Sequence, residues 1–179
     1  KQGFFDVEFL ATGQRFGIVA LPAFSGSPDE FFCIDSALSW LVHDDTTRDG
    51  LVRALRRSGL DMSRERFSWS QINPACGSWQ WETGSRYEST RKRYATVGVP
   101  VLEMCHDAPS WMGRVGKYPN DLAEAAAAWR RIDQRWRTTW GALEVWNEPD
   151  IFFGADLPAD QYVALVKTLA HATGDKTPA

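Results

Sequence analysis

Hydrophobic and polar residues alternate along two short stretches at the start of the chain, residues 4–10 and 15–21, which is the period of a β-strand. The Thr12-Gly13-Gln14 segment between them has the composition of a tight turn. No helical pattern follows, so the two strands are predicted to form a hairpin. Residues 1–30, which end in a Gly-, Ser- and Pro-containing linker, are therefore set apart from the rest. This unit either seals the floor of the following domain or ends an accessory β domain.

From residue 31 onward the pattern changes to an alternation of strands and helices. The predicted strands are residues 32–38, 61–69, 100–105 and a fourth that begins at residue 143. Helices are predicted from a cap at Thr46 to Gly59, at 85–96, from a capping box at Asp121 and Glu124, and at 159–173. The third helix has the clearest apolar stripe, in which the recurring positions are Leu122, Trp129, Ile132 and Trp136.

Alternating strands and helices indicate an α/β domain with a parallel sheet. A doubly wound sheet and a barrel both fit this periodicity. The first strand is not followed by a glycine-rich turn, which argues against a nucleotide-binding doubly wound fold. Residues 31–179 are thus predicted to form one α/β domain with its own core.

The fourth strand leads into the most informative stretch of the chain. Leu143 and Val145 alternate with polar or aromatic neighbours, and Pro149 then stops the strand. Proline also favours an extended backbone at the preceding residue, Glu148. An amide beside a carboxyl group, Asn147 and Glu148, suits a site that orients a hydroxyl group and moves a proton. An ordinary polar strand end is the alternative interpretation.

The segment Trp146-Asn147-Glu148-Pro149 resembles the strand-four motif of the clan A glycoside hydrolases, which are (β/α)8 TIM barrels. The resemblance, most similar to families 39 and 5, implies that residues 31–179 form the N-terminal half of such a barrel. It also implies that Glu148 is the general acid/base and that Asn147 hydrogen-bonds the sugar 2-hydroxyl. The expected reaction is retaining cleavage of O-glycosidic bonds in an oligo- or polysaccharide.

Two further segments carry the same resemblance. Residues 62–70 resemble the second strand. By this resemblance Arg64 is the family's arginine, which supports the nucleophile. Arg66 is the competing assignment, because Glu65 falls at a position that is usually apolar. An Arg–Glu ion pair within the strand is the structural alternative. Residues 100–111 resemble the third strand and its loop, which places His106 at a sugar-binding position.

Nine tryptophans are many for 179 residues, and several follow predicted strand ends. Tryptophan rings stack on the apolar faces of sugars, so these side chains are candidate substrate platforms. Those expected to bind substrate are Trp69, Trp111 and Trp146, and Trp40 and Trp79 share the same kind of position.

The clan's nucleophile lies at the end of strand seven, beyond the four units that this chain resembles. Three interpretations follow. The chain is a piece of a longer or split glycosidase, whose other half is encoded in the same gene or on another chain; it is a half-barrel that pairs with a partner; or it is a non-catalytic carbohydrate-binding protein. On the first interpretation, the chain alone is expected to be inactive.

Charge and cysteine content exclude other classes. A net charge of −3 argues against a nucleic-acid partner, and no apolar run is long enough to span a membrane. The three cysteines form no CxxC pair, so no metal or cofactor is expected. A metal site at His43, Asp44, His106 and Asp107 is an alternative that no spacing selects. No signal peptide is visible, and a secreted or periplasmic location is compatible with that because a signal can be removed.

Overall fold

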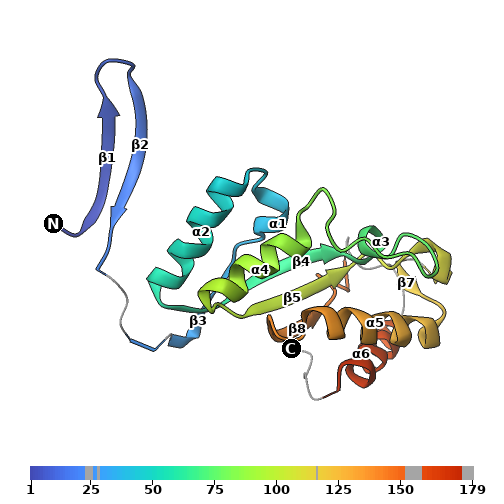
Figure 1. Ribbon diagram of the computed structural model, residues 1–179. Coiled ribbons are helices and arrows are strands. Elements are labelled where there is room, and N and C mark those ends of the chain that lie inside the picture. Colours follow the sequence, from blue (N-terminus) through green and yellow to red (C-terminus); the bar gives the residue numbers. More distant parts are fainter. Residues whose placement is uncertain (23–25, 28, 116, 152–158, 175–179) are drawn as a thin grey trace.

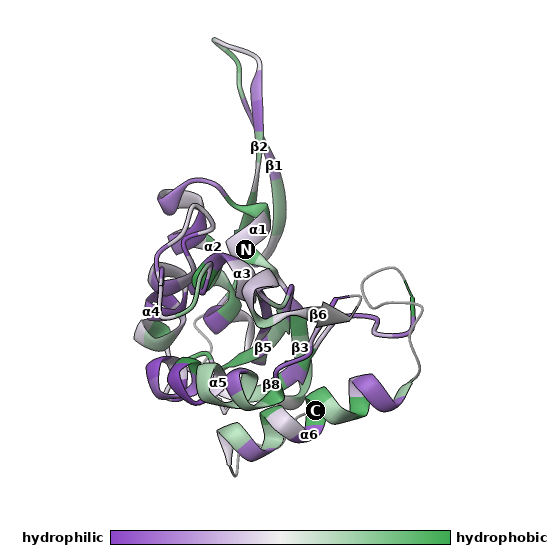
Figure 2. Cartoon of the chain, turned by 90° about the vertical axis from the view of Figure 1, so that its right-hand side faces the viewer, coloured by the Kyte–Doolittle hydropathy of each residue, from purple (hydrophilic) through white to green (hydrophobic). Residues whose placement is uncertain are grey.

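The computed structural model describes residues 1–22, 26–27, 29–115, 117–151 and 159–174. Two strands at the start, β1 (Gly3–Phe9) and β2 (Gln14–Ala20), pair antiparallel over their whole length. The predicted hairpin is therefore present, and it projects away from the sheet and its helices (Figure 1, Figure 2). Its assignment to an accessory domain stays a prediction.

The two faces of the hairpin differ. Five hydrophobic side chains alternate onto one face and are partly exposed there: Phe5, Val7, Phe9, Phe16 and Ile18. The charged residues of the other face form ion pairs, because Arg15 lies 3.0 Å from Asp6 and 3.8 Å from Glu8. The alternation that predicted the strands thus gives an amphipathic ribbon.

Four parallel strands form the main sheet in the order β3-β4-β5-β8, so β3 and β8 are its open edges. Their bounds are β3 (Asp29–Asp35), β4 (Leu60–Ser68), β5 (Val101–His106) and β8 (Trp140–Val145). Neighbours in the sheet follow one another in the chain with helices between them, which is the connectivity of consecutive βα units in a partial TIM barrel.

Each strand is followed by helical segments. They are α1 (Leu38–Leu41), α2 (Asp45–Ser58), α3 (Trp69–Ile72), α4 (Tyr87–Val97), the 3₁₀ turn η1 (Ser110–Met112), α5 (Leu122–Trp136) and α6 (Ala159–Thr173). A small antiparallel pair, β6 (Arg114–Val115) and β7 (Tyr118–Pro119), precedes α5. No helix in these described ranges has the length and apolar character that a membrane span requires.

The structure confirms most of the predicted elements and corrects several bounds. The cap of α5 is Asp121, as predicted, and its side chain accepts a hydrogen bond from the Glu124 amide at 2.9 Å. The cap of α2 is Asp44 rather than Thr46, because the Asp44 carboxylate accepts from the Thr47 amide at 2.7 Å. Strand β8 begins at Trp140, three residues before the predicted start, where the apolar alternation had been interrupted by Gly141.

The first strand was placed too late. It ends at Asp35, and residues 38–41 form α1 instead. The backbone turns at Ala37, which has a left-handed φ of 44°, and the amides of Leu38 and Ser39 then donate to the Glu65 carboxylate at 2.7 and 3.1 Å. A long-range acceptor therefore ends a strand that the local pattern would have continued.

The core lies between the sheet and its helices. Phe67 of β4 is fully buried and packs on Tyr87 of α4 and on Trp129 and Trp136 of α5. The predicted stripe of α5 is buried at Trp129, Ile132 and Trp136, so it faces the sheet. Because side chains alternate along a strand, Arg64 and Arg66 lie on the opposite face from Phe67.

Candidate active site

Left-handed residues follow three of the four parallel strands at their carboxyl ends. Ala37 has a φ of 44°, Asp107 of 58° and Trp146 of 73°. Such conformations cost about 1–3 kcal/mol each and gather at functional sites, where surrounding contacts hold them. In a (β/α)8 barrel this edge of the sheet is the catalytic face. The backbone thus marks the edge that the sequence motifs indicate.

Glu148 also has a left-handed φ, of 44°, and this corrects the prediction of an extended backbone before Pro149. The reason is a turn: the Ile151 amide donates to the Glu148 carbonyl at 3.2 Å, which requires the chain to fold back. The Glu148 side chain is exposed on the edge of the sheet.

A chain of hydrogen bonds links Glu148 to the sheet. The Arg64 Nη2 donates to Asn147 Oδ1 at 2.8 Å, and Asn147 Nδ2 donates to Glu148 Oε2 at 3.1 Å. The first bond fixes which way the Asn147 amide points, and the second leaves the Glu148 carboxylate one acceptor oxygen that is not used by Asn147. Three predicted site residues from two strands are therefore brought together.

Arg64 is itself held by two carboxylates. Its Nε and Nη2 form a bidentate pair with Glu144 at 2.6 and 2.5 Å, and its Nη1 donates to Asp35 at 2.7 Å. The hydrogen bond to Glu144 raises the pKa of Arg64 further above its usual value, so the guanidinium is permanently charged. Asp35 and Glu144 were not predicted as partners of Arg64, although Asp35 ends β3 and Glu144 lies on β8.

The competing assignment, Arg66, also pairs with Asp35 and lies over the Trp40 ring at 5.4 Å. Among the described contacts, however, Arg64 is the arginine that reaches Asn147. The alternative of an Arg–Glu ion pair holds in part, because Arg64 does pair with a glutamate, but that partner is Glu144. Glu65 faces the helices.

His106 is placed at the carboxyl end of β5, as predicted, but it is only 7 % exposed. Its Nδ1 lies 3.0 Å from Asp107 Oδ2, and its ring packs edge-on against Trp40 with centroids 5.0 Å apart. Its Nε2 is buried and has no hydrogen-bond partner among the described residues. Nδ1 is thus engaged by Asp107, and Nε2 is closed off from solvent.

Burial sorts the candidate tryptophans. Trp69 and Trp146 are 0 % and 2 % exposed; Trp69 packs on Trp129, and Trp146 packs on Tyr118 at 5.0 Å. Both are core residues here, and neither presents a ring face to a ligand. Their positions after strand ends had suggested substrate binding. The sequence gives the place of each tryptophan along the chain, but not which side chains cover it.

Trp111 is half-buried, and its indole Nε1 donates to the Asn73 carbonyl at 2.9 Å. This bond fixes the ring while part of it stays exposed. Trp79, by contrast, is stacked on Trp81 at 4.8 Å and covered by the Arg131 guanidinium at 4.9 Å, so it packs against α5.

Metal chemistry finds no support in the described ranges, where no three His, Cys, Asp or Glu side chains gather as ligands. The alternative metal site at His43, Asp44, His106 and Asp107 is therefore set aside. Asp44 instead caps α2, and Asp107 pairs with His106.

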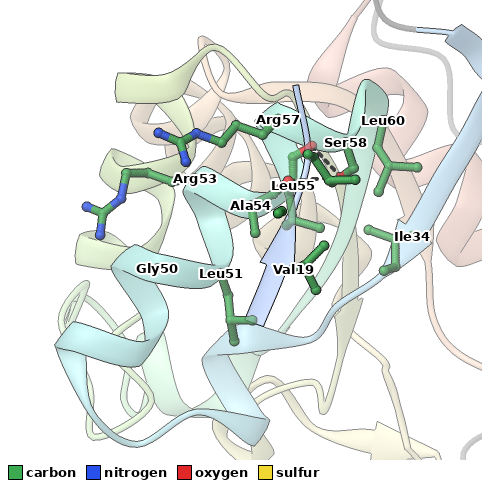
Figure 3. Close-up of a pocket in the computed structure, with 12 residues that line it drawn as sticks. Val19, Ile34, Gly50, Leu51, Arg53, Ala54, Leu55, Arg57, Ser58 and Leu60 are labelled. Carbon is green, nitrogen blue, oxygen red and sulfur yellow. Dashed lines mark hydrogen bonds between the residues drawn. The ribbon is translucent and has the colours of Figure 1, made fainter. Parts of the chain in front are cut away.

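A cavity of about 570 Å³ lies elsewhere, between the end of β2 and helix α2 (Figure 3). It is lined by Val19, Ile34, Leu51 and Leu55, and by Leu60 at the amino end of β4. None of the candidate site residues lines this cavity, so it is separate from the site.

Solved structures resemble the chain closely in fold. A family 39 glycoside hydrolase from Bacteroides cellulosilyticus matches with a TM-score of 0.71 and 16 % identity, over 99 % of this chain and 37 % of that one. A GH5_18 protein from Bifidobacterium longum, in complex with Manβ1-4GlcNAc, gives 0.61 and 13 %, over 83 % and 42 %. The chain therefore shares the fold of part of a (β/α)8 barrel with these glycoside hydrolase structures.

A family 30 subfamily 8 xylanase from Clostridium acetobutylicum gives a TM-score of 0.58 and 17 % identity, over 87 % of this chain and 42 % of the xylanase. The chain thus spans about two fifths of the lengths of these glycosidases. No protein-family model and no curated protein matches the sequence. At these identities the likeness shows a shared barrel fold and leaves the substrate open.

Proposed function

We propose that this chain contributes the acid/base half of a retaining O-glycosidase that acts on an oligo- or polysaccharide. The observation that carries the proposal is the Arg64–Asn147–Glu148 chain of hydrogen bonds at the carboxyl edge of the parallel sheet. In this role Glu148 donates a proton to the leaving oxygen and later takes one from water, while Asn147 hydrogen-bonds the hydroxyl beside the anomeric carbon.

The second carboxylate comes from outside this chain. In retaining enzymes the two carboxyl groups stand about 5–5.5 Å apart across the sugar. Glu144 lies on β8 itself and is already engaged by Arg64, and Glu103 is fully buried beneath the helices. The remaining half of the barrel is thus the partner that supplies the nucleophile, either from the same gene or from another chain.

The open edges of the sheet support such a partner. Strands β3 and β8 each have one neighbour, and Phe32 and Ile34 of β3 are 57 % and 39 % exposed. Unpaired edges and exposed apolar side chains favour association with further strands. We call the complete barrel formed in this way the active assembly.

The test is turnover of aryl β-glycosides by the 179-residue chain and by the full reading frame that encodes it, with the mass in solution measured alongside. We expect activity in the active assembly and none in the chain alone. The variant Glu148→Gln should lower kcat by about 10²–10⁴-fold, because general acid catalysis contributes that much, while sugar binding persists.

Two controls make this test specific. The variant Asp150→Asn removes a neighbouring exposed carboxylate and should leave turnover unchanged. The leaving group of a dinitrophenyl glycoside departs without a proton. In Glu148→Gln the rate of the first step should therefore fall far less for dinitrophenyl glycosides than for phenyl glycosides. An equal loss for both substrates would contradict the acid role, and sugar binding without turnover in any form would favour the non-catalytic binding protein.

A further inference from the structure

The carboxyl end of β5 holds a His–Asp pair whose two members differ in access. The His106 side chain is 8 % exposed and that of Asp107 is 47 % exposed. The His106 Nε2 atom is buried, so a sugar hydroxyl cannot reach it in this structure. The exposed member of the pair is a carboxylate, which accepts hydrogen bonds at two oxygens.

Asp107 is held by its side chain and by its backbone. His106 Nδ1 lies 3.0 Å from its Oδ2. Its own carbonyl accepts from the Ser70 amide at 2.8 Å, which fixes the left-handed backbone. The hydrogen bond from His106 also holds the pKa of Asp107 below its usual range, although burial opposes it, so the carboxylate is charged at neutral pH.

The ring of His106 cannot easily turn away from this carboxylate. It packs edge-on against Trp40, and Trp40 lies in turn beneath the Arg66 guanidinium. A nearly buried imidazole whose Nδ1 proton is donated to a carboxylate is a support that orients the carboxylate. His106 engages one of the two Asp107 carboxylate oxygens, Oδ2, and leaves the other for a ligand.

The register of the sheet places Asp107 beside the proposed catalytic pair. Cys105 of β5 is opposite Val145 of β8, and the Trp146 amide continues the ladder by donating to the Cys105 carbonyl at 2.9 Å. Residues 107 and 147 each follow this pair by two positions, just beyond the ends of β5 and β8. Neighbouring strands lie about 4.8 Å apart, so a sugar bound at Asn147 is within reach of the Asp107 carboxylate.

We propose that Asp107, positioned by the buried His106, is a substrate-binding carboxylate that accepts hydrogen bonds from hydroxyl groups of a sugar ring. This inference rests on the proposed function, since it names a contact in the same site. It also assigns His106 a positioning role in place of the direct sugar contact that its sequence position had suggested.

The test compares Asp107→Gly with Asp107→Asn in the active assembly, with 4-nitrophenyl β-glycosides of glucose, mannose and xylose as probes. Glycine keeps the left-handed backbone without strain and removes the whole side chain with its carboxylate. Because hydrogen bonds to a charged group are strong, we expect Asp107→Gly to raise KM on the order of 10–100-fold with a much smaller change in kcat. Asp107→Asn, which retains an acceptor oxygen, should recover part of this loss.

A double-mutant cycle with His106→Phe separates the two roles. Phenylalanine fills the space of the imidazole, so the fold is retained. If His106 acts through Asp107, the double variant His106→Phe/Asp107→Gly should have the KM of Asp107→Gly alone. Additive losses, or a larger rise of KM in His106→Phe than in Asp107→Gly, would overturn the proposal and restore His106 as the contact.

Failure of this inference and failure of the proposed function give different results. An unchanged KM in Asp107→Gly, with kcat still lost in Glu148→Gln, would refute the Asp107 contact alone. Full turnover in Glu148→Gln, with a raised KM in Asp107→Gly, would refute the acid assignment while the Asp107 contact stands. The variant pairs therefore test the two statements independently.

Discussion

Two adjacent residues of β4, Arg64 and Glu65, point to opposite faces of the sheet and belong to different kinds of polar network. Glu65 is fully buried beneath the helices, and its carboxylate accepts from the Leu38 and Ser39 amides and from the Tyr94 hydroxyl at 2.8 Å. Arg64 faces the other side, where its partners Glu144 and Asp35 remain partly exposed.

The helix-facing network is closed. Arg91 and Glu103 are 1 % and 0 % exposed and form a bidentate pair, and Trp140 Nε1 donates to Glu103 at 3.1 Å. The Arg64 network at the carboxyl edge of the sheet is open, because it ends at the exposed Glu148 carboxylate, and the Asp107 side chain near this edge is 47 % exposed. Satisfied buried polar groups hold a fold together, whereas spare acceptors at strained strand ends are available to a ligand.

The largest expected effect on stability comes from breaking the closed network. Arg91→Met removes the guanidinium and leaves Glu103 buried without its charge partner, which costs about 3–5 kcal/mol. We expect urea unfolding of this variant to show that loss, or the chain to be largely unfolded.

Removing both charges is the control for that prediction. In Arg91→Met/Glu103→Leu the Glu103 carboxylate is gone as well, and Glu65 keeps its hydrogen bonds from the Leu38 and Ser39 amides, so most of the lost free energy of unfolding should return. A double variant as unstable as the single one would mean that Arg91 stabilises the protein through its contacts with Ser39 and Tyr87 instead.

A smaller loss is expected from Glu65→Gln. The amide keeps the shape of the side chain but turns an NH₂ group toward donors such as the Leu38 or Ser39 amide, so one of them loses its acceptor. We expect the free energy of unfolding to fall by about 1–3 kcal/mol. The change should also expose residues 36–41 to limited proteolysis, which a uniform loss of stability with no local cleavage would contradict.

These two networks also show what the sequence could and could not predict. The alternation of strands and helices and the Asp121 cap follow from local patterns, since each depends on residues close in the chain. Arg64, Asn147 and Glu148 were singled out by the family resemblance of two short motifs, and the bond between Arg64 and Asn147 was not predicted. The burial of the Glu65 and Glu103 carboxylates could not be predicted, because the groups that bond to them come from other segments of the chain.

The same reason explains why the burial of Trp69, Trp146 and His106 was not predicted. A strand-end position predicts the edge of the sheet at which a side chain starts, but α5 covers Trp69 and the loop around Tyr118 covers Trp146. The identity of Asp107 as the exposed partner of His106 depends on a left-handed backbone that nothing in the local sequence specifies.

On the open face, Arg64→Met should separate activity from stability. Its partners Glu144 and Asp35 are 26 % and 41 % exposed, so water can solvate them and the cost in stability should be about 1 kcal/mol or less. Turnover in the active assembly should nevertheless fall by at least about tenfold, because the Asn147 amide loses the donor that orients it.

Arg66→Met is the matched variant for this prediction. It removes the neighbouring arginine on the same face, which pairs with Asp35 and has no described contact with Asn147. We expect a smaller effect on kcat than for Arg64→Met. The reverse order would show that Arg66 is the arginine that the second-strand resemblance identifies.

The smallest expected effect lies at the rim of the closed network, where Glu88 of α4 bridges to α5. Burial raises the pKa of Glu88, but hydrogen bonds from Arg135 and Trp136 at 2.8 Å and the nearby Lys92 outweigh it, so the pKa is lowered. A lowered folded-state pKa contributes stability that is fully present above the unfolded value of about 4.3 and is lost as the pH falls through the folded value.

Glu88→Gln should therefore be less stable than the parent protein at pH 7, by up to about 1 kcal/mol, and the two should converge as the pH falls below about 4. Urea unfolding between pH 3 and pH 7 measures this difference, and 1 M salt should reduce it because Arg135 and Lys92 are largely exposed. A difference that is constant across this range would place the contribution of Glu88 in its neutral contact with Trp136 rather than in its charge.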